Sequence, residues 1–414
     1  MKVPEVKTSL DLLTYDPHTG ILNVEGVPVT YHCNVFNHFF AEGIKLALGT
    51  EKGRELVYRS SEFAHYRLFS SIKQKYALSP KEMVEFGEKY FKSRGLGILD
   101  IKDKNNILLI ASTHANTYIR ILRAFSDIPV CDVERGFIAA LLEVALDIPP
   151  GSLKVEEKGC LASHDPVCRM EIEILKKPVK LPDVDCERAP LYKVPGAYER
   201  MKTMNLLTQK IPAPDDAGII SLDSAFSDIR KVWITQLPSE YYAYAKTRLQ
   251  DMADENVVKY TLTLAGFNCV FMTYVSIAKT PIGDIIFKGT HTQEERARRF
   301  LSIGNYLGFG IFEVPHLHYE AGTGTCECVI NLYNFYENNF LRAIGRKPLS
   351  YFLPSAVLAM VSAVYKYRFH ESQHHGILID AFRMFDKLYD RSEFSLKFDE
   401  RKNMQTVEMK VAVV

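Results

Sequence analysis

Four potential metal ligands lie close together just before an alternating strand. Glu157, Cys160, His164 and Cys168 fall within twelve residues of one another. Thiolates, imidazoles and carboxylates are the ligands that zinc prefers, and a tetrahedral site with four protein ligands has no open position. The spacing Glu-x-x-Cys-x7-Cys predicts a metal-binding hairpin, for which Cys131, at the start of a preceding helix, is the candidate fourth ligand. Separate cysteines in an ordinary hairpin remain an alternative, whereas a redox pair would normally show Cys-x-x-Cys.

A second group of potential ligands occurs in the second half of the chain. His316 and His318 alternate on one predicted strand, and Cys326 and Cys328 alternate on the next, so each pair shares one face of its strand. If the two faces coincide, four good ligands meet in one hairpin. The alternative is that these are ordinary exposed or core residues of two strands.

Further along the chain, His370, Glu371 and His374 match the pattern H-E-x-x-H. In that pattern two histidines one helical turn apart bind zinc and the glutamate acts as a base. The residues His375 and Gly376 follow at once and interrupt the apolar helix that normally continues the motif. The two groups together predict a possible second metal site, for iron or zinc, rather than a peptidase.

Charge and hydropathy limit the class of protein. The 51 basic and 50 acidic residues nearly cancel, which gives no support for binding nucleic acid or an anionic membrane. The longest apolar stretch, residues 352–365, is too short to span a bilayer and contains a proline. We therefore expect a soluble, cytoplasmic protein, in which eight cysteines are more consistent with metal ligands than with disulfides.

The chain divides nearly in half at residues 176–216, which are rich in proline and charge and predict a linker. Residues 90–101 resemble 301–314, where a helix runs through a glycine pair into a strand, and residues 123–146 resemble 342–365. The pattern predicts an α+β fold of two related units, 1–175 and 217–414, each a small antiparallel sheet packed with several helices.

The second unit differs from the first in two ways. It carries an additional segment, residues 370–391, which predicts a helical insertion. It also has Ser350 opposite Cys131 and no cysteine in its final hairpin, so the thiol cluster belongs to the first unit alone.

Residues 24–174 resemble the 4-vinyl reductase domain family, which also forms the sensor domains of phenol- and xylene-responsive bacterial activators. The resemblance rests on "LSPKEMVEFGEKYFKSRGLG" (78–97), "PVCDVERGFIAALLEVAL" (129–146) and "VEEKGCLASHDPVC" (155–168). It implies a structural zinc bound by Cys131, Glu157, Cys160 and Cys168, and it gives His164 no ligand role. The second half is then a degenerate second copy.

The resemblance also implies a pocket between the helices and the hairpin, although the phenol-contacting histidine and tryptophan of the family correspond here to Met83 and Thr113. Phenol recognition therefore does not carry over. The candidate wall residues, each of which is also compatible with an ordinary core, are Phe63, Tyr66, Phe69, Met83, Phe86, Tyr90, Thr113, His114 and Tyr118. Nothing resembles a phosphate-binding loop, so the ATPase and DNA-binding modules of the activators are not expected.

Three functions fit these observations. The first is a sensor-type protein that binds a small apolar or aromatic molecule, with the two units paired as an intramolecular pseudo-dimer, or with two chains paired as a homodimer, and with an unknown downstream protein partner. The second is a metal-dependent enzyme that uses iron or zinc in the second half. The third, suggested only by the name of the family, is an accessory protein of tetrapyrrole metabolism.

Overall fold

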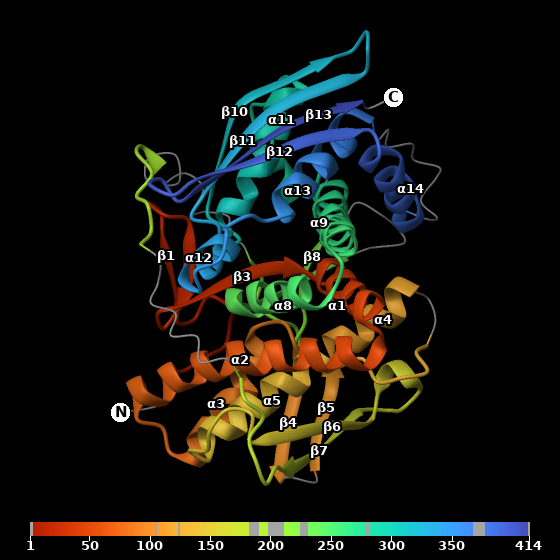
Figure 1. Cartoon of the computed structure of the whole chain (residues 1–414). Coiled ribbons are helices and arrows are strands. Elements are labelled where there is room, and N and C mark those ends of the chain that lie inside the picture. Colours follow the sequence, from red (N-terminus) through yellow and green to blue (C-terminus); the bar gives the residue numbers. More distant parts are fainter. Residues whose placement is uncertain are drawn as a thin grey trace.

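The computed structural model describes residues 3–103, 106–122, 125–181, 190–197, 211–223, 231–278, 281–366 and 377–412. Within these residues the strands form three antiparallel sheets. Figure 1 shows the two four-stranded sheets at opposite ends of the molecule, with helices and a third sheet between them. The architecture is the predicted α+β fold of repeated units.

Unit one, residues 34–174, contains three helices, a hairpin, two further helices and a second hairpin. Its helices are α1 (Asn34–Leu48), α2 (Thr50–Tyr76), α3 (Pro80–Ser93), α4 (Thr113–Leu122), α5 (Asp132–Ala145) and the short η1 (Leu161–Ser163). Its strands are β4 (Gly97–Asp103), β5 (Asn106–Ser112), β6 (Leu153–Gly159) and β7 (Cys168–Ile174). The strands form one sheet in the order β4-β5-β7-β6.

Unit two, residues 239–412, repeats this arrangement. Its helices are α8 (Ser239–Met252), α9 (Glu255–Ile277), α10 (Pro281–Ile286), α11 (Gln293–Leu301), η2 (Ser302–Asn305), α12 (Tyr336–Ala343), α13 (Phe352–Val361), η3 (Ser362–Lys366) and α14 (Ile377–Tyr389). Its strands are β10 (Ile311–Glu320), β11 (Thr325–Tyr333), β12 (Ser392–Asp399) and β13 (Met404–Ala412), in the order β10-β11-β13-β12. The order matches that of unit one, and α14 falls within the predicted insertion 370–391.

Local sequence signals recur at matching places in the two units. Helix α3 begins after a capping box between Ser79 and Glu82, and α11 begins after one between Thr292 and Glu295. Each capping box satisfies backbone N–H groups that a helix start would otherwise leave without partners. The same type of N-cap therefore sets the start of α3 in unit one and of α11 in unit two.

The long helices of the two units also pack in the same way. Gly136 of α5 lies against Ser61, the twelfth residue of α2, and Ser355 of α13 lies against Gly266, the twelfth residue of α9. In each pair one glycine allows the close approach, because a Cβ atom would overlap the neighbouring helix. Gly136 and Ser355 thus occupy equivalent positions, which also places Ser350 opposite Cys131.

The third sheet joins the two halves of the chain. Its strands are β1 (Leu13–Asp16), β2 (Ile21–Val24), β3 (Val27–Cys33), β8 (Ile220–Asp223) and β9 (Lys231–Pro238), in the order β1-β2-β3-β9-β8. Strands β3 and β9 pair antiparallel with Tyr31 opposite Gln236, and each runs directly into the first helix of its unit. The Tyr31 N–H donates to the carbonyl of Leu307, and the Gln236 N–H donates to that of Arg94. The halves are therefore connected by strand pairing and by two reciprocal backbone hydrogen bonds.

The repeated glycine pair is explained by this central contact. Gly95 and Gly308 have φ values of 77° and 85°, a left-handed conformation that favours glycine. A Cβ atom on Gly95 would lie 2.6 Å from the carbonyl oxygen of Ile234, and one on Gly308 would lie 2.5 Å from that of Val29. Each glycine turn of one unit thus packs against the strand that leads into the other unit.

Among the described helices, α9 is long and apolar enough to cross a membrane. Its apolar window is 78% buried inside the protein, as in the core helix of a soluble protein. Helix α9 packs against α1 of unit one and α13 of its own unit, so its apolar surface faces protein on several sides.

Candidate metal centre and apolar cavity

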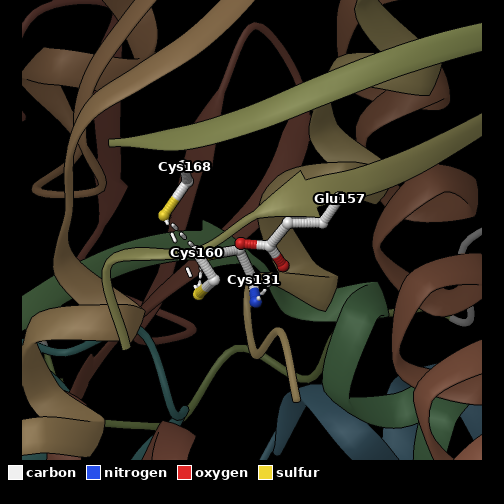
Figure 2. Close-up of side chains that lie close together, drawn as sticks. All are labelled: Cys131, Glu157, Cys160 and Cys168. Carbon is white, nitrogen blue, oxygen red and sulfur yellow. Dashed lines mark hydrogen bonds between the residues drawn. The ribbon is translucent and has the colours of Figure 1, made fainter. Parts of the chain in front are cut away.

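The four predicted metal ligands of unit one come together at one end of its sheet. Cys131 is the N-cap residue of α5, Glu157 lies on β6, Cys160 follows β6 directly and Cys168 is the first residue of β7. The register of the β6–β7 pair shifts between Glu157 and Gly159, which breaks the regular alternation just before Cys160. All four side chains are buried, and Figure 2 shows those of Glu157, Cys160 and Cys168 pointing toward one another.

The distances fit a tetrahedral site. The sulfur of Cys131 lies 3.5 Å from that of Cys168 and 4.0 Å from that of Cys160, and the last two are 3.9 Å apart. A Zn–S bond of about 2.3 Å requires S–S edges of about 3.8 Å in a tetrahedron. Disulfide bonding would require about 2.05 Å. All four potential ligand atoms lie within 4.8 Å of one another, so the group can hold a metal ion.

Glu157 supplies the remaining donor. Its Oε2 accepts a hydrogen bond from the Cys131 N–H at 3.0 Å. Its Oε1 is buried and has no hydrogen-bond partner among the described residues. An unpaired buried carboxylate oxygen costs free energy unless a proton or a cation satisfies it. A metal ion among the thiols would therefore complete both the coordination and the hydrogen bonding of this residue.

Electrostatics also favour a cation at this place. Burial and then the neighbouring Cys160 raise the pKa of both Cys131 and Glu157 well above their usual values. Hydrogen bonds from Cys131 and Cys168 lower the pKa of Cys160 to about 2. Without a cation, one ionised thiolate disfavours ionisation of the neighbouring thiols and of the carboxyl group. A divalent ion would stabilise several thiolates at once.

The hairpin tip holds the ligands in place without contributing one itself. Leu161 donates its N–H to the sulfur of Cys168 at 3.2 Å, and the Cys160 N–H donates to Asp165 Oδ2 at 2.8 Å. His164 has a left-handed φ of 71° at the tip, and its ring stacks on Phe125. His164 is not part of the group of potential ligands.

A chain of hydrogen bonds supports Cys131 from the other side. The Ser112 hydroxyl lies 3.3 Å from the Cys131 sulfur and donates to Glu134 Oε1 at 3.0 Å. The same carboxylate oxygen is 2.8 Å from Nδ1 of His114. Such outer contacts fix the orientation of metal ligands. A metal ion bound by all four donors would connect the last hairpin to α5 and would leave no position for a substrate.

Unit two replaces this centre by a polar network. Lys246 is buried and pairs with Glu337, which also accepts a hydrogen bond from the Ser350 hydroxyl. The Ser350 N–H donates to Gln405 Oε1 at 2.9 Å, and Gln405 Nε2 donates to the Ser350 carbonyl at 2.8 Å. Gln405 lies on β13, so these bonds join the last hairpin to the start of α13. The Gln405 amide connects the last hairpin to the start of α13, the elements equivalent to those that carry the potential metal ligands in unit one, whereas Lys246 and Glu337 lie on α8 and α12.

The second predicted ligand group does not assemble. In the β10–β11 pair, His318 lies opposite Glu327 on the exposed face, and His316 is exposed as well. Cys326 and Cys328 are buried on the other face. The two faces therefore do not coincide, and within the described ranges only the unit-one group brings three or more potential ligands together. The motif His370, Glu371 and His374 lies outside the described residues.

The nine residues predicted to line a pocket in unit one are spread through its core. The ring of Tyr90 packs against those of Phe69 and Phe86, and all three are fully buried. Met83 is fully buried near them, whereas Phe63 packs against Tyr244 of unit two. The others lie elsewhere: Tyr66 is half-buried, Thr113 and His114 start α4, and Tyr118 contacts His38. None of the nine lines the cavity described next.

Two neighbouring apolar pockets, referred to below as the two compartments of one cavity, lie between the central sheet, α9 and η2. One compartment has a volume of about 80 Å³ and the neighbouring one about 50 Å³. Both are lined by Cys269, Thr273, Ile303, Leu307 and Phe309. His32 and Cys33 at the end of β3 also line the larger compartment, so both halves of the chain contribute to its wall.

Unit one fills the equivalent space with side chains. The rings of Phe91 and Phe137 lie 5.0 Å apart there, whereas the equivalent residues of unit two are Gly304 and Ala356. Two further positions also have larger side chains in unit one. Leu68 of unit one is equivalent to Thr273 of unit two, and Tyr90 is equivalent to Ile303. The ring of Phe312 lies against Gly304 and compensates in part. The cavity thus results from smaller side chains on an otherwise shared framework.

No family model matches the chain, and a search of the curated proteins finds no match. The resemblance to 4-vinyl reductase domains accordingly stays a prediction from the motifs.

Proposed function

We propose that this chain is a cytoplasmic small-molecule-binding protein of the sensor type, built from two 4-vinyl-reductase-like units. Unit one is the rigid partner, in which a metal ion joins the last hairpin to α5, and unit two binds the ligand. The observation that carries the proposal is the apolar cavity of unit two, which occupies a place that unit one fills with aromatic rings.

The metal proposed for unit one is zinc in a structural role. Three thiols and one carboxylate form a donor set typical of zinc and unsuited to magnesium or calcium, which prefer oxygen ligands. The closed tetrahedral arrangement supports a structural site. Cys131, Glu157, Cys160 and Cys168 would hold the ion, and the ion would fix the β6–β7 hairpin to α5.

The size and lining of the cavity suggest the class of ligand. The compartments, of about 80 and 50 Å³, are each smaller than the roughly 150 Å³ of an engineered protein cavity that takes benzene, and they share five lining residues. Their lining is mainly aliphatic and aromatic, and Nδ1 of the buried His32 has no hydrogen-bond partner among the described residues. A single-ring or similarly small apolar molecule with one polar group fits these features.

The pairing of the units supports a tandem that acts as an intramolecular pseudo-dimer. Tyr31 and Gln236 face each other at the centre of the β3–β9 pair, and their backbone hydrogen bonds to the opposite unit are reciprocal. A pair of this kind needs no second chain to complete it. We therefore expect a monomer, without a nucleic-acid or membrane partner, that signals to a downstream protein.

Ligand binding can be tested by filling the cavity. Native mass spectrometry of the purified chain would reveal a co-purified ligand, the bound metal and the oligomeric state together. Toluene and indole serve as probes, and their binding can be measured by thermal unfolding. A ligand at a hundredfold its Kd raises the free energy of unfolding by about 2.7 kcal/mol. Thr273→Leu introduces the residue of unit one, and we expect it to weaken probe binding at least tenfold.

The matched control is Thr273→Val, which replaces the hydroxyl by a methyl group and keeps the branched shape of the side chain. We expect this variant to bind toluene as the wild type does. Equal binding by the leucine variant, or no probe binding together with no co-purified ligand, would contradict the proposal.

The alternative functions have less support from the described residues. A metal-dependent enzyme needs a second centre, but the histidines and cysteines of the β10–β11 hairpin lie on opposite faces of the sheet. A tetrapyrrole is several times larger than the cavity. Iron in the purified protein would favour the enzyme, and a Soret-region absorbance band would favour the tetrapyrrole role.

A further inference from the structure

Two buried cysteines from opposite halves of the chain meet at the wall of the cavity. Cys33 ends β3 and is the N-cap residue of α1, whereas Cys269 lies in the middle of α9. Both side chains are buried, and their sulfur atoms are 3.3 Å apart. They are separated by 236 positions in the sequence, so their contact depends on the packing of the two units.

The surroundings of this pair differ from those of the metal centre. In unit one, three sulfurs and a carboxylate surround a common point. Cys33 and Cys269 belong to no group of three or more potential ligands in the described part of the chain. Two thiols alone do not form a closed metal site of the kind seen in unit one. The pair is better suited to reaction between its two sulfurs.

The elements that carry the sulfurs are packed closely enough for a bond. A disulfide needs about 2.05 Å between sulfurs, a little over an ångström less than the present distance. Helices α1 and α9 are in tight contact, since a Cβ atom on Gly43 would lie 2.3 Å from a methyl group of Thr261. Side-chain rotation with a small adjustment of these helices would close the gap.

The two sulfurs are chemically unequal. The Phe36 N–H at the start of α1 donates to the sulfur of Cys33 at 3.4 Å. Burial alone would raise the pKa of Cys33, but the hydrogen bonds with Cys269 and with Phe36 lower it below its ordinary value. The hydrogen bond with Cys33, followed by burial, raises the pKa of Cys269. One sulfur is therefore favoured as a thiolate nucleophile, while the other stays a thiol.

The cavity provides the room for a small oxidant. Both cysteines line its larger compartment, beside apolar residues such as Ile234 and Phe309. Hydrogen peroxide and short alkyl hydroperoxides are small enough for this space, whereas a peptide disulfide is not. The chemistry of the site thus selects small peroxides over larger disulfide oxidants.

We propose that Cys33 and Cys269 form a peroxide-oxidisable dithiol that closes to a disulfide between the two halves of the protein. The Cys33 thiolate attacks the peroxide, the O–O bond breaks, and a sulfenic acid forms; the leaving oxygen takes up the proton that Cys33 had lost and departs as water or an alcohol. The Cys269 thiol then attacks this sulfur, its proton joins the sulfenic hydroxyl, and one water leaves as the S–S bond forms. Two electrons pass from the sulfurs to the peroxide, and a dithiol reductant reverses the reaction. This inference does not depend on the proposed ligand.

The test treats the full-length, metal-loaded protein with hydrogen peroxide, denatures it, and blocks the remaining thiols with an alkylating reagent. Peptide mass mapping should show a Cys33–Cys269 cross-link, a mass loss of two hydrogens, and recovery of both thiols after dithiothreitol. Because the cross-link closes a loop of more than two hundred residues, we expect the melting temperature to rise by several degrees.

The matched variants are Cys33→Ser, whose hydroxyl oxygen can replace the sulfur as the N-cap acceptor, and Cys326→Ser, which changes a buried cysteine elsewhere. The first should lose the cross-link and the temperature shift, and the second should keep both. Wild-type protein that retains alkylatable Cys33 and Cys269 after oxidation, or that cross-links other cysteines instead, would overturn the inference.

Discussion

Replacing Cys160 by serine removes one of the three thiols of the metal centre. A serine hydroxyl is not ionised at neutral pH and is a poor zinc ligand, so the tetrahedron would be left with three donors. The three S–S distances of 3.5–4.0 Å show that the wild-type side chains already surround a point that suits a zinc ion. The cost of reorganising them on binding is therefore small, and losing one should lower the affinity by orders of magnitude.

The effect on stability follows from linkage between binding and folding. Free zinc at about a thousandfold its Kd stabilises the folded state by about 4.1 kcal/mol, provided that the unfolded chain does not bind it. For a unit of this size that free energy corresponds to roughly 10 °C in melting temperature. The Cys160→Ser variant should therefore melt roughly 10 °C below the wild type, and chelation should lower the wild type toward the same value.

The assay combines metal analysis with thermal unfolding in the presence and absence of a chelator. Cys326→Ser is the matched control, because it also places a hydroxyl at a buried cysteine position, on β11 and outside the metal centre. We expect one zinc per chain in the wild type and in the control, and none in Cys160→Ser. A Cys160→Ser protein that keeps its metal and its melting temperature would refute the assignment, as would a wild type that never binds zinc.

Two further predictions concern the framework. Burial and the neighbouring Glu62 raise the pKa of Glu143 to about 9 from an ordinary 4.5, so the folded protein holds a proton that the unfolded chain releases. The free energy of unfolding should then fall as pH rises through this window, by up to about 1.4 kcal/mol per unit, and Glu143→Gln should flatten that dependence in denaturant titrations. Gly97 has a φ of 118°, and a Cβ atom there would lie 1.8 Å from the carbonyl of Ala111. Gly97→Ala should lower the melting temperature clearly, whereas Gly322→Ala, with no atom near its Cβ position, should change it little; equal melting temperatures would contradict the argument.

The metal centre and the repeat were predictable because their signals are local. Three ligands lie within one hairpin, and the fourth starts a helix after a proline turn. The glycine pairs stand at matching places, because each must take a left-handed turn against a strand of the other half. Backbone conformation of this kind restricts residue identity strongly, so it remains visible in a single sequence.

The remaining features depend on non-local register and volume. Alternation placed His316 with His318 and Cys326 with Cys328, but the strand register puts Leu317 opposite Cys328 and separates the two pairs. A shift of one residue reverses the faces of a strand, and the sequence of two strands does not determine it. The pairing of β3 with β9 is also non-local, which explains why two related, paired units were predicted and the sheet that they share was not.

The aligned repeats contain a sequence difference that indicates the cavity. Gly304 and Ala356 both fall within segments that align with unit one, opposite Phe91 and Phe137. Each substitution looks ordinary alone, because glycine and alanine are common in helices and cores. Only the loss of two rings that contact each other in space indicates an empty volume, and that contact is not apparent from the sequence.

The two units thus stabilise the contact between the last hairpin and a buried helix start by different interactions. Each must hold its last hairpin against a buried helix start, where polar groups need partners. Unit one has thiols and a carboxylate for a metal, with a filled interior, whereas unit two has the Ser350–Gln405 hydrogen bonds and a cavity. A filled, cross-linked unit changes little on ligand binding, but a hollow one gains contacts. Helix α9 lines the cavity and packs on α1 of the other unit, so if unit two binds a ligand as proposed, a change there would reach unit one through this helix.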